Sequence, residues 1–484
     1  MNKIKITALL VLIVLVGACN LDTYNEATLT PGQSLADSLG FRSLVFSVYE
    51  RTNDFVFYGQ ETMMHPEVMA DNMILVSTTR YAGQAANTVG SHMDRWGVDV
   101  GGTTLSNGRY VAINECNTVI AKIDAMTTIP QSLRNRYKGE AYFLRALNYL
   151  ELHRVYSYEP GKEVNGFNLG VVLRTEPVEK VSDADLKSRS TNVEGYALME
   201  ADLLQAVTLL PNPSSAAATT SPYRASKQAA RALLAKVYLY WGKYAEAAQQ
   251  ADLALAFSFA PLTTSANFVS SWTQSPHPES IFESPIVPSD WTSVDGPNYS
   301  LNSMTMNLIS SAQYAVAASN ELIAAHEAGD VRKNLYENVA GAGPVGTLGK
   351  YRSRKWSGGN ASNAFMENIP IIRRAEVMLI SAEGKARSGD EAGALSILNT
   401  LRANRGLGAV TDTGSALIDR ILNERRVELA FEGNRWFDLK RLGKDITKPA
   451  GTTPTVPYSD FRILARIPVE QVAINPSIVQ NPGY

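Results

Sequence analysis

Few residue patterns in this sequence could support catalysis. The five histidines show neither the HxxxH spacing nor any other spacing typical of a metal site. The glycine pattern GAGPVG at 341–346 matches a dinucleotide-binding turn, but a helix-like segment precedes it and Pro344 interrupts it, whereas that turn follows a strand and opens a helix. Lys350 is followed by Tyr351 instead of the Ser or Thr of a phosphate-binding loop, and no GxSxG motif occurs. We therefore predict no enzymatic activity, no cofactor and no metal ligands.

One thiol stands where it could be chemically modified. A basic start and an apolar run over residues 6–16 precede the small residues of the tetrad VGAC, which ends at Cys19. This order is typical of a secretory signal peptide, and the run is too short to span a bilayer. The tetrad resembles the lipobox of bacterial lipoproteins, in which the cysteine carries the lipid; the alternative is an ordinary signal with a cysteine nearby by chance. We expect a signal peptide over 1–18 and a lipidated flexible tether over 19–34, anchored through Cys19 to a membrane.

Composition points to a globular protein that does not bind nucleic acid. Hydrophobic residues make up 45% of the chain, enough for a sizeable core. Removing Lys3 and Lys5 with the signal peptide leaves 43 basic and 47 acidic residues, a net charge of −4, so no basic excess attracts phosphate groups. Once Cys19 is acylated, Cys116 is the only other cysteine, and its place on an apolar helical face predicts a core residue.

The densest run of charged and aromatic residues is NERRVELAFEGNRWFDLKRLG, at 423–443. Glu424 and Glu428 lie on one face of a predicted helix, four residues apart, and Gly433 separates this helix from the next. One interpretation is an acid–base site. The other is a partly buried ion-pair network that joins two helices, since buried charges must be paired. We favour the structural interpretation.

Helical periodicity dominates the elements that would position such residues. Apolar residues recur every three or four positions over 133–155, and a second helix is predicted from about 193 to 210. Two further segments, 225–257 and 373–406, have the small and aromatic residues of tetratricopeptide helical hairpins, although generic helical hairpins give similar patterns. We predict a mainly α fold in which tetratricopeptide-like hairpins form a scaffold. A single domain over 35–484 would carry long inserted loops and short strands around 261–307 and 340–368.

Several stretches, in order along the chain, resemble the SusD/RagB family of nutrient-binding lipoproteins of Bacteroidetes. They are GEAYFLRALNYLELHRVY, the two predicted hairpins, ERRVELAFEGNRWFDLKRLG and the C-terminal RILARIPVEQVAINPSIVQNPGY. The resemblance implies a helical scaffold without catalysis, lipid-anchored at the outer membrane and facing the cell exterior. It also implies a SusC-like TonB-dependent transporter as partner and an oligosaccharide, or in some members a peptide, as ligand.

Sugar capture favours aromatic faces together with a few polar side chains, and exposed loops are the place to expect them. Trp96 is the first candidate ligand-binding residue. Trp291 and Tyr299 belong to the inserted loops. Asp71, Asn72 and Arg80 come from a stretch that resembles a family segment near the ligand. Tyr81 and Trp356 complete the candidate ligand-binding residues.

Four hypotheses follow. The first is a glycan-binding lipoprotein that feeds a transporter. The second is a peptide-binding version, whose pocket would contain fewer stacked aromatic rings. The third is a tetratricopeptide-type assembly scaffold without a small ligand, which predicts an open concave helical groove where capture predicts covering loops. The fourth is an enzyme, which needs a converging acid and base or a metal site that the sequence does not show.

Overall fold

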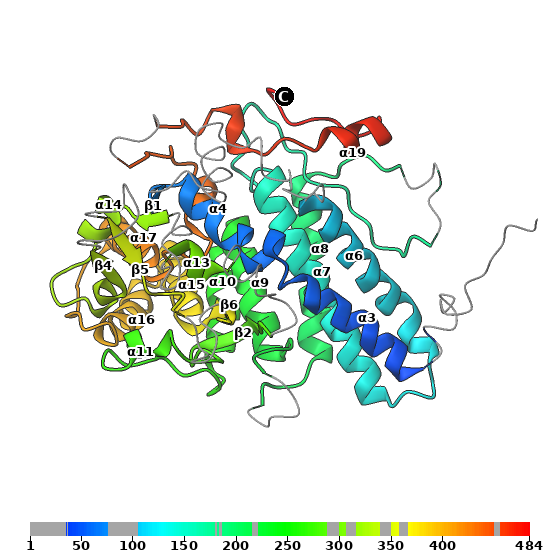
Figure 1. The fold of residues 1–484 in the computed structure, drawn as a ribbon, viewed down its shortest axis with the longest axis horizontal. Helices are drawn as coiled ribbons and strands as arrows, with labels where there is room; N and C mark the ends of the chain where they lie inside the picture. The colour runs from blue at the N-terminus through cyan, green and yellow to red at the C-terminus, as the bar shows by residue number, and fades with distance from the viewer. Residues whose placement is uncertain are drawn as a thin grey trace, which may run out of the picture.

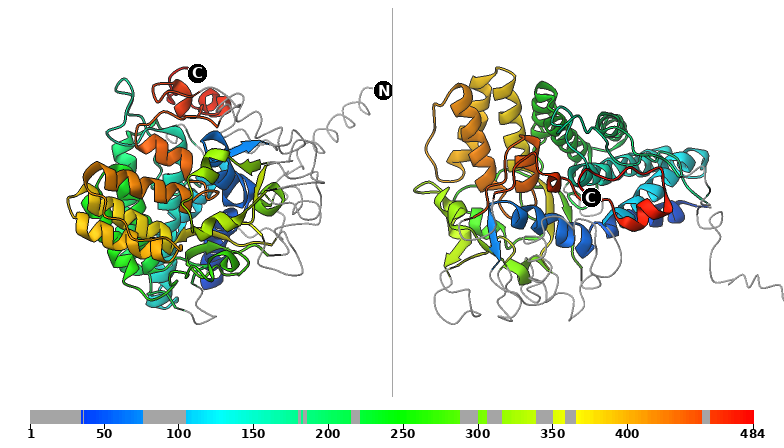
Figure 2. Two further views of the ribbon diagram at one scale, coloured as in Figure 1. Left: turned by 90° about the vertical axis from the view of Figure 1, so that its left-hand side faces the viewer. Right: turned by 90° about the horizontal axis from the view of Figure 1, so that it is seen from above.

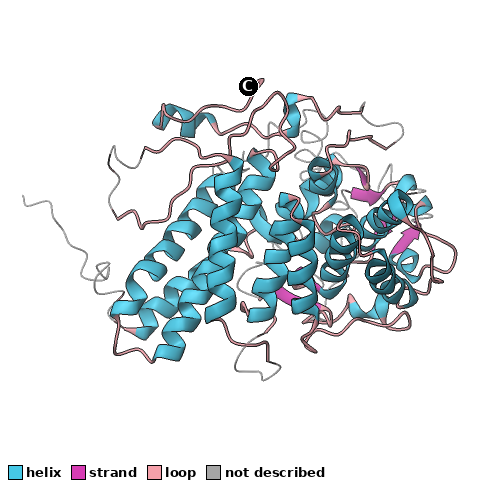
Figure 3. Cartoon of the chain, turned by 180° about the vertical axis from the view of Figure 1, so that it is seen from behind, coloured by secondary structure: helices cyan, strands magenta, loops and turns pink. Residues whose placement is uncertain are grey.

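The structure is a computed structural model, and it describes residues 35, 37–75, 105–179, 182, 186–214, 221–287, 300–305, 316–338, 350–357, 366–449 and 455–484. The predicted signal peptide, Cys19 and the tether lie outside these residues. The described chain is mainly helical, with strands of three to five residues, which confirms the predicted fold class (Figure 3). None of the described helices is long and apolar enough to cross a bilayer.

Four helices form one side of the molecule (Figure 1): α3 (Ser38–Arg51), α6 (Leu105–Lys122), α7 (Gln131–Tyr156) and α8 (Asn192–Leu209). The periodic pattern predicted α7 and α8 to within two residues at their ends. Helix α7 contacts α6, α8 and α3, and every residue from Phe143 to Tyr156 is buried. Helix α7 is therefore the centre of this helical layer. Cys116 on α6 is buried as predicted, and burial raises the pKa of its thiol.

Both predicted hairpins are present. The first pairs α9 (Lys227–Trp241) with α10 (Tyr244–Leu255), and the second pairs α15 (Arg374–Arg387) with α16 (Glu391–Ala403). Gly242 ends α9 with a φ of 78°, a left-handed conformation that costs glycine little. The hairpins are far apart in sequence but lie side by side, because α10 packs on α15 (Figure 2). A Cβ at Gly384 would lie 2.6 Å from the Tyr244 carbonyl oxygen, so this close approach requires glycine.

Two small antiparallel sheets join segments that are distant in sequence. The four-stranded sheet has the order β1 (Met73–Leu75), β3 (Val316–Ala318), β5 (Tyr351–Ser353), β4 (Tyr336–Asn338). In the other sheet, β2 (Ser280–Ser284) pairs with β6 (Ile369–Arg373). The inserted regions were predicted to contain short strands. Strand β2 lies within the predicted region 261–307, and β5 lies within 340–368.

The remaining helices connect these layers. The α-helices are α4 (Glu61–Met69), α11 (Phe268–Ser271), α13 (Leu301–Thr305), α14 (Asn320–Ala324), α17 (Gly414–Glu428), α18 (Arg435–Arg441) and α19 (Val469–Ile474). The other helical turns are η1 (Phe55–Gly59), η2 (Ile123–Ala125), η4 (Val331–Leu335) and η5 (Phe461–Ile463).

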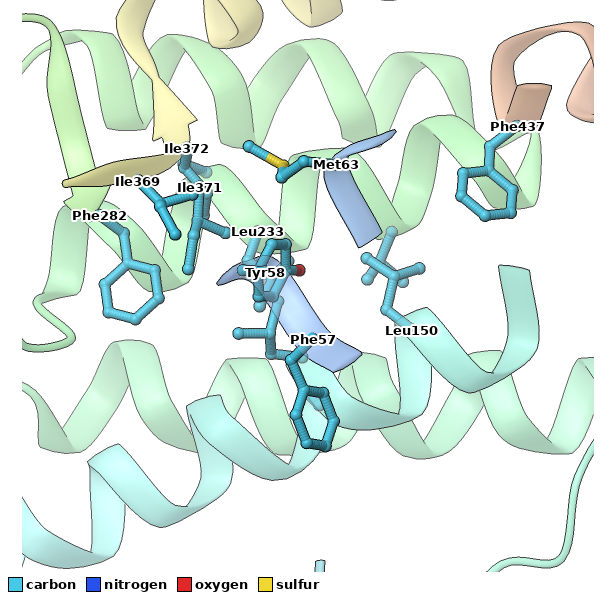
Figure 4. Close-up of a cluster of buried hydrophobic side chains, with 14 of the residues drawn as sticks. Phe57, Tyr58, Met63, Leu150, Leu233, Phe282, Ile369, Ile371, Ile372 and Phe437 are labelled. Carbon is cyan, nitrogen blue, oxygen red and sulfur yellow. The ribbon is translucent and has the colours of Figure 1, made fainter. Parts of the chain in front are cut away.

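The main core forms where the helical layer meets the hairpins and the two-stranded sheet (Figure 4). Its residues come from elements spread over most of the chain, and they include Phe57, Tyr58, Met63, Leu150, Leu233, Phe282, Ile372 and Phe437. Burial of an apolar side chain of this size stabilises the fold by about 1.5–3 kcal/mol. A shared core of this kind holds the sheets in fixed positions relative to α7 and α9.

Candidate functional site

The four-stranded sheet holds the ends of segments that carry predicted ligand residues. Leu75, the last residue of β1, pairs with Val316, the first residue of β3. Helix α13 packs against β3. The chain that leaves β1 contains Arg80, Tyr81 and Trp96, and the chain that leads to α13 contains Trp291 and Tyr299. These five residues lie outside the described residues, but the first segment follows β1 and the second precedes α13, and β3 lies next to both β1 and α13.

Asp71, in the turn before β1, is held by two arginines. Its Oδ1 and Oδ2 accept hydrogen bonds from Nε and Nη2 of Arg435, at 2.6 and 2.8 Å, and Nη2 of Arg426 lies 3.2 Å from Oδ2. Burial alone would raise the pKa of the Asp71 carboxyl, but the hydrogen bonds and charge of Arg435 and then the charge of Arg426 outweigh it, so its pKa is below the usual value. Asp71 is therefore ionised and joins the start of β1 to α17 and α18.

Asn72 completes this junction and is buried. Its Nδ2 donates to Glu67 Oε2 at 2.9 Å, and its Oδ1 accepts from Arg426 Nε at 3.0 Å. The other Glu67 oxygen accepts from the backbone N–H groups of Asn434 and Arg435, at 3.0 and 3.2 Å. Asp71 and Asn72 thus bind other residues of the protein through their polar atoms. These bonds position strand β1, which directly precedes the predicted ligand segment.

Trp356 requires a correction. Its side chain is 1% exposed, and its indole Nε1 donates to the Phe431 carbonyl oxygen at 3.2 Å. The ring makes an edge contact with Trp272, with 5.7 Å between ring centroids. A glycine-rich neighbourhood suggested an exposed loop, but the preceding strand β5 turns the tryptophan into the core. The ring therefore presents no face on which a sugar could stack.

The charged stretch at 423–443 forms a buried ion-pair network, which confirms the structural interpretation. Glu428 Oε1 accepts from Arg373 and Arg405, at 3.2 and 3.0 Å, while Oε2 accepts from Arg405 and Arg332, at 2.9 and 3.1 Å. Burial would raise the pKa of Glu428, but the charges of Arg405 and Arg373 lower it well below the usual value. Such a carboxylate is permanently ionised at neutral pH and cannot act as a general acid.

The network is larger than the sequence indicated. Beyond the two expected helices, it includes β6 through Arg373, η4 through Arg332 and the end of the second hairpin through Arg405. A separate branch joins α17, α18 and α15, where Arg425 pairs with Asp438 at 2.8 Å and with Glu376 at 3.2 Å. Sequence analysis did not single out Arg332, Arg373 and Arg405. The one available signal was an arginine pair directly after the apolar run IPII, where a strand would be buried.

No grouping of three or more His, Cys, Asp or Glu side chains that could hold a metal ion occurs among the described residues. His153 is buried in the α7–α8 contact, where burial and then the charges of Arg189 and Lys440 lower its pKa to about 3. A neutral, enclosed imidazole of this kind packs as part of the core.

Comparison with protein families agrees with this architecture. The family model described as "SusD family" matches residues 337–484, and a SusD-like model described as "Starch-binding associating with outer membrane" matches residues 34–239. The chain is therefore similar to the SusD/RagB family in both of these regions. The first matched region contains α7 and most of the first helix of the α9–α10 hairpin. The second contains the second hairpin and the part of the ion-pair network formed by Arg373, Arg405 and Glu428.

Individual SusD-like proteins are similar along most of the chain. A curated SusD-like protein P2 of Formosa agariphila is 25% identical over 539 aligned positions that cover 100% of both chains. A crystal structure of a SusD superfamily protein from Bacteroides thetaiotaomicron has a TM-score of 0.80 at 24% identity, and the match covers 91% of this chain and 99% of that one. A laminarin-binding SusD-like protein has a TM-score of 0.69 at 24% identity, over 92% of this chain and 99% of that one.

Proposed function

We propose that this SusD-like protein captures oligosaccharides at the outer membrane and delivers them to a SusC-like TonB-dependent transporter. The observation that carries the proposal is the match of residues 34–239 to a family described as starch-binding and associated with the outer membrane. A protein of similar fold binds laminarin, which is also a carbohydrate. The charged clusters of the described residues are paired internally, so they support a scaffold for binding and not an acid–base centre.

The binding site in this proposal lies on the two segments that join the framework next to the β1–β3 pair. Trp96, Trp291, Tyr299 and Tyr81 supply ring faces for the apolar faces of sugar rings, and Arg80 supplies hydrogen-bond donors for hydroxyl groups. Asp71 and Asn72 act indirectly, because their bonds to α17 and α18 hold the turn that precedes the first segment. Trp356 is left out because it is buried.

The anchoring part of the proposal concerns residues outside the described ones. Residues 1–18 act as a signal peptide, Cys19 carries the lipid, and 19–34 tether the domain that begins at residue 35. Several acyl chains together hold a protein firmly, since each buried CH2 contributes about 0.8 kcal/mol. The lipid holds the domain at the outer membrane, facing the cell exterior, where the transporter partner lies.

A purely structural scaffold is less well supported. Helix α9, the first helix of the first hairpin, is buried at 12 of its 15 positions, against α10, α8, α15 and the two-stranded sheet. One face of α10, with Ala247, Ala248, Ala251 and Ala254, is also buried, and α15 of the second hairpin packs on α10. The face that tetratricopeptide scaffolds leave open for a partner helix is therefore occupied by this protein's own elements.

Calorimetric titration of the chain from Asn20 onward, which contains all the described residues, tests the proposal. The titrants are a panel of oligosaccharides and short peptides. We expect saturable binding of at least one oligosaccharide, lost in Trp96→Ala and kept in Phe461→Ala, an exposed aromatic near the C-terminus. If only peptides bind, the ligand is a peptide and not an oligosaccharide. If Trp96→Ala binds the oligosaccharide with unchanged affinity, Trp96 is not part of the binding site.

A further inference from the structure

A cavity lies away from the β1–β3 pair, on the side of the molecule formed by the helical layer. It has a volume of about 500 Å³ and lies between α6, the described segments 171–178 and 186–189, and the C-terminal helix α19. Residues of α6 and α19 line it together, and Figure 1 shows α19 above α6 on this side. We call it the α6–α19 cavity. Its size is within the range of small-molecule sites, about 300–1,000 Å³.

The walls of the α6–α19 cavity are aliphatic. They include Val111, Val171, Val172, Ile467, Ile474 and Ile478. Two of these residues are exposed to water, Val111 at 45% and Ile474 at 67%. Helix α19 has no buried residue. When a ligand covers apolar surface that is otherwise exposed to water, the complex is stabilised by about 25 cal/mol per Å².

The polar groups of the walls are already engaged with the protein. Tyr110 donates its hydroxyl to the Val172 carbonyl at 2.9 Å. The Asn114 amide both donates to the Val178 carbonyl and accepts from its N–H, at 3.2 and 2.7 Å. Asn475 donates to the Lys187 carbonyl at 2.8 Å. A sugar, which needs hydroxyl partners, is therefore poorly matched to this cavity, and its ligand differs in class from the one under Proposed function.

Two arginines line the cavity, Arg174 and Arg189, and Arg189 carries its positive charge without a counter-ion in the part of the chain that the structure describes. The Arg189 guanidinium is buried and donates only to neutral oxygens: the carbonyls of Gly170, Val479, Tyr156 and Leu169, and the Asn481 side chain, at 2.6–3.1 Å. Among the described residues, no carboxylate lies within ion-pair distance of Arg189, and none of the residues that line the cavity is acidic. Burial lowers the pKa of Arg189 to about 10, which leaves it protonated at neutral pH. A buried cation of this kind is stabilised by any anion that enters beside it.

We propose that the α6–α19 cavity binds a small amphipathic carboxylate, with its alkyl chain against the valine and isoleucine walls and its carboxylate facing the charge of Arg189. The apolar walls supply affinity in proportion to the length of the chain, and the charge selects an acid over an alcohol or an amine of the same length. The N–H groups of Arg189 need not leave their carbonyl partners, because charge attraction acts beyond hydrogen-bond distance.

Calorimetry of the chain from Asn20 onward with octanoate, octan-1-ol and octylammonium tests this proposal. We expect one saturable site for octanoate, with the alcohol and the amine bound about tenfold more weakly or not at all, because each lacks the attraction to a partly desolvated charge. Equal affinity for octanoate and octylammonium would overturn the proposal, and so would no heat of octanoate binding at millimolar concentration.

Two substitutions at one half-exposed position locate the site. Val111→Glu puts a competing carboxylate into the cavity, whereas Val111→Gln has the same shape and no charge. We expect the first to weaken octanoate binding about tenfold and the second to weaken it far less. Val193→Glu, on the similarly exposed surface of α8 and outside the cavity, is the matched control and should bind as the wild type does. Unfolding curves of all three variants show that each is folded. A loss of binding in Val193→Glu equal to that in Val111→Glu would overturn the assignment to this cavity.

Discussion

Glu428 is the residue on which the buried network depends, and replacing it with glutamine isolates its charge. Both carboxylate oxygens accept hydrogen bonds from arginines, and the side chains of Glu428, Arg373 and Arg405 are 0% exposed. Glu428→Gln keeps the shape of the side chain but leaves three guanidinium groups short of one negative charge. Removing one partner from a buried ion pair costs about 3–5 kcal/mol, because the remaining charge stays buried.

This cost converts into a shift of the melting temperature. The entropy of unfolding is about 2.1 cal/mol/K per residue, so a cooperative domain of about 450 residues unfolds with about 0.9 kcal/mol/K. A loss of about 4 kcal/mol then lowers Tm by about 4 °C. Differential scanning calorimetry measures such a shift directly, and it also shows whether the domain unfolds in one transition.

The matched control is Glu337→Gln, the same change in an ion pair whose carboxylate side chain is 44% exposed. Exposed pairs contribute about 0–1 kcal/mol, so this variant should melt within about 1 °C of the wild type. The pH dependence gives a second test. Because the folded-state pKa of Glu428 is lowered, its contribution is complete above the ordinary glutamate pKa of about 4.3 and is lost as pH falls through the folded value. A Glu428→Gln variant as stable at pH 7 as Glu337→Gln would refute the reasoning.

Three further outcomes are expected. Gly195→Ala places a Cβ 2.0 Å from the ring of buried His153, so it should lower the free energy of unfolding by about 1–3 kcal/mol or more. Gly408→Ala, whose Cβ would have no atom within 4 Å, is the control and should be nearly neutral. Denaturant unfolding measures both variants. Asp71→Asn should cost about 1–3 kcal/mol in the same assay and also weaken oligosaccharide binding, and an affinity equal to that of the wild type would show that this turn does not position the ligand segment. Burial raises the pKa of Glu283 to about 7, so between about pH 4.3 and 7 the folded state keeps a proton that the unfolded state releases. The free energy of unfolding should therefore fall as pH rises through that range. Glu283→Gln should remove this fall, which a pH series of thermal melts measures.

Much of the helical framework was predictable because its signals are local. Amphipathic spacing identifies α7 and α8 from a few adjacent turns, and small residues with a glycine at the turn identify the two hairpins. The charge-rich run at 423–443 was also correctly assigned to structure, since a helix that is both charged and apolar must pair its charges when it is buried. The expected roles of Cys19, Trp96 and Trp291 remain predictions about residues outside the described ones.

The tertiary structure decided which distant segments meet, and this changed the meaning of individual side chains. Trp356 and Asp71 were both predicted to bind the ligand. The sequence around each residue is the same whether its side chain faces solvent or contacts other parts of the protein, so local sequence could not distinguish the two cases. Trp356 is buried against Trp272, whereas Asp71 is partly exposed and is held by Arg435, more than 300 positions away. The arginines around Glu428 come together in the same way, through β6, η4 and the second hairpin. Local periodicity determines the conformation of the backbone, but the environment of a side chain is determined by neighbours that the folded chain brings from elsewhere in the sequence.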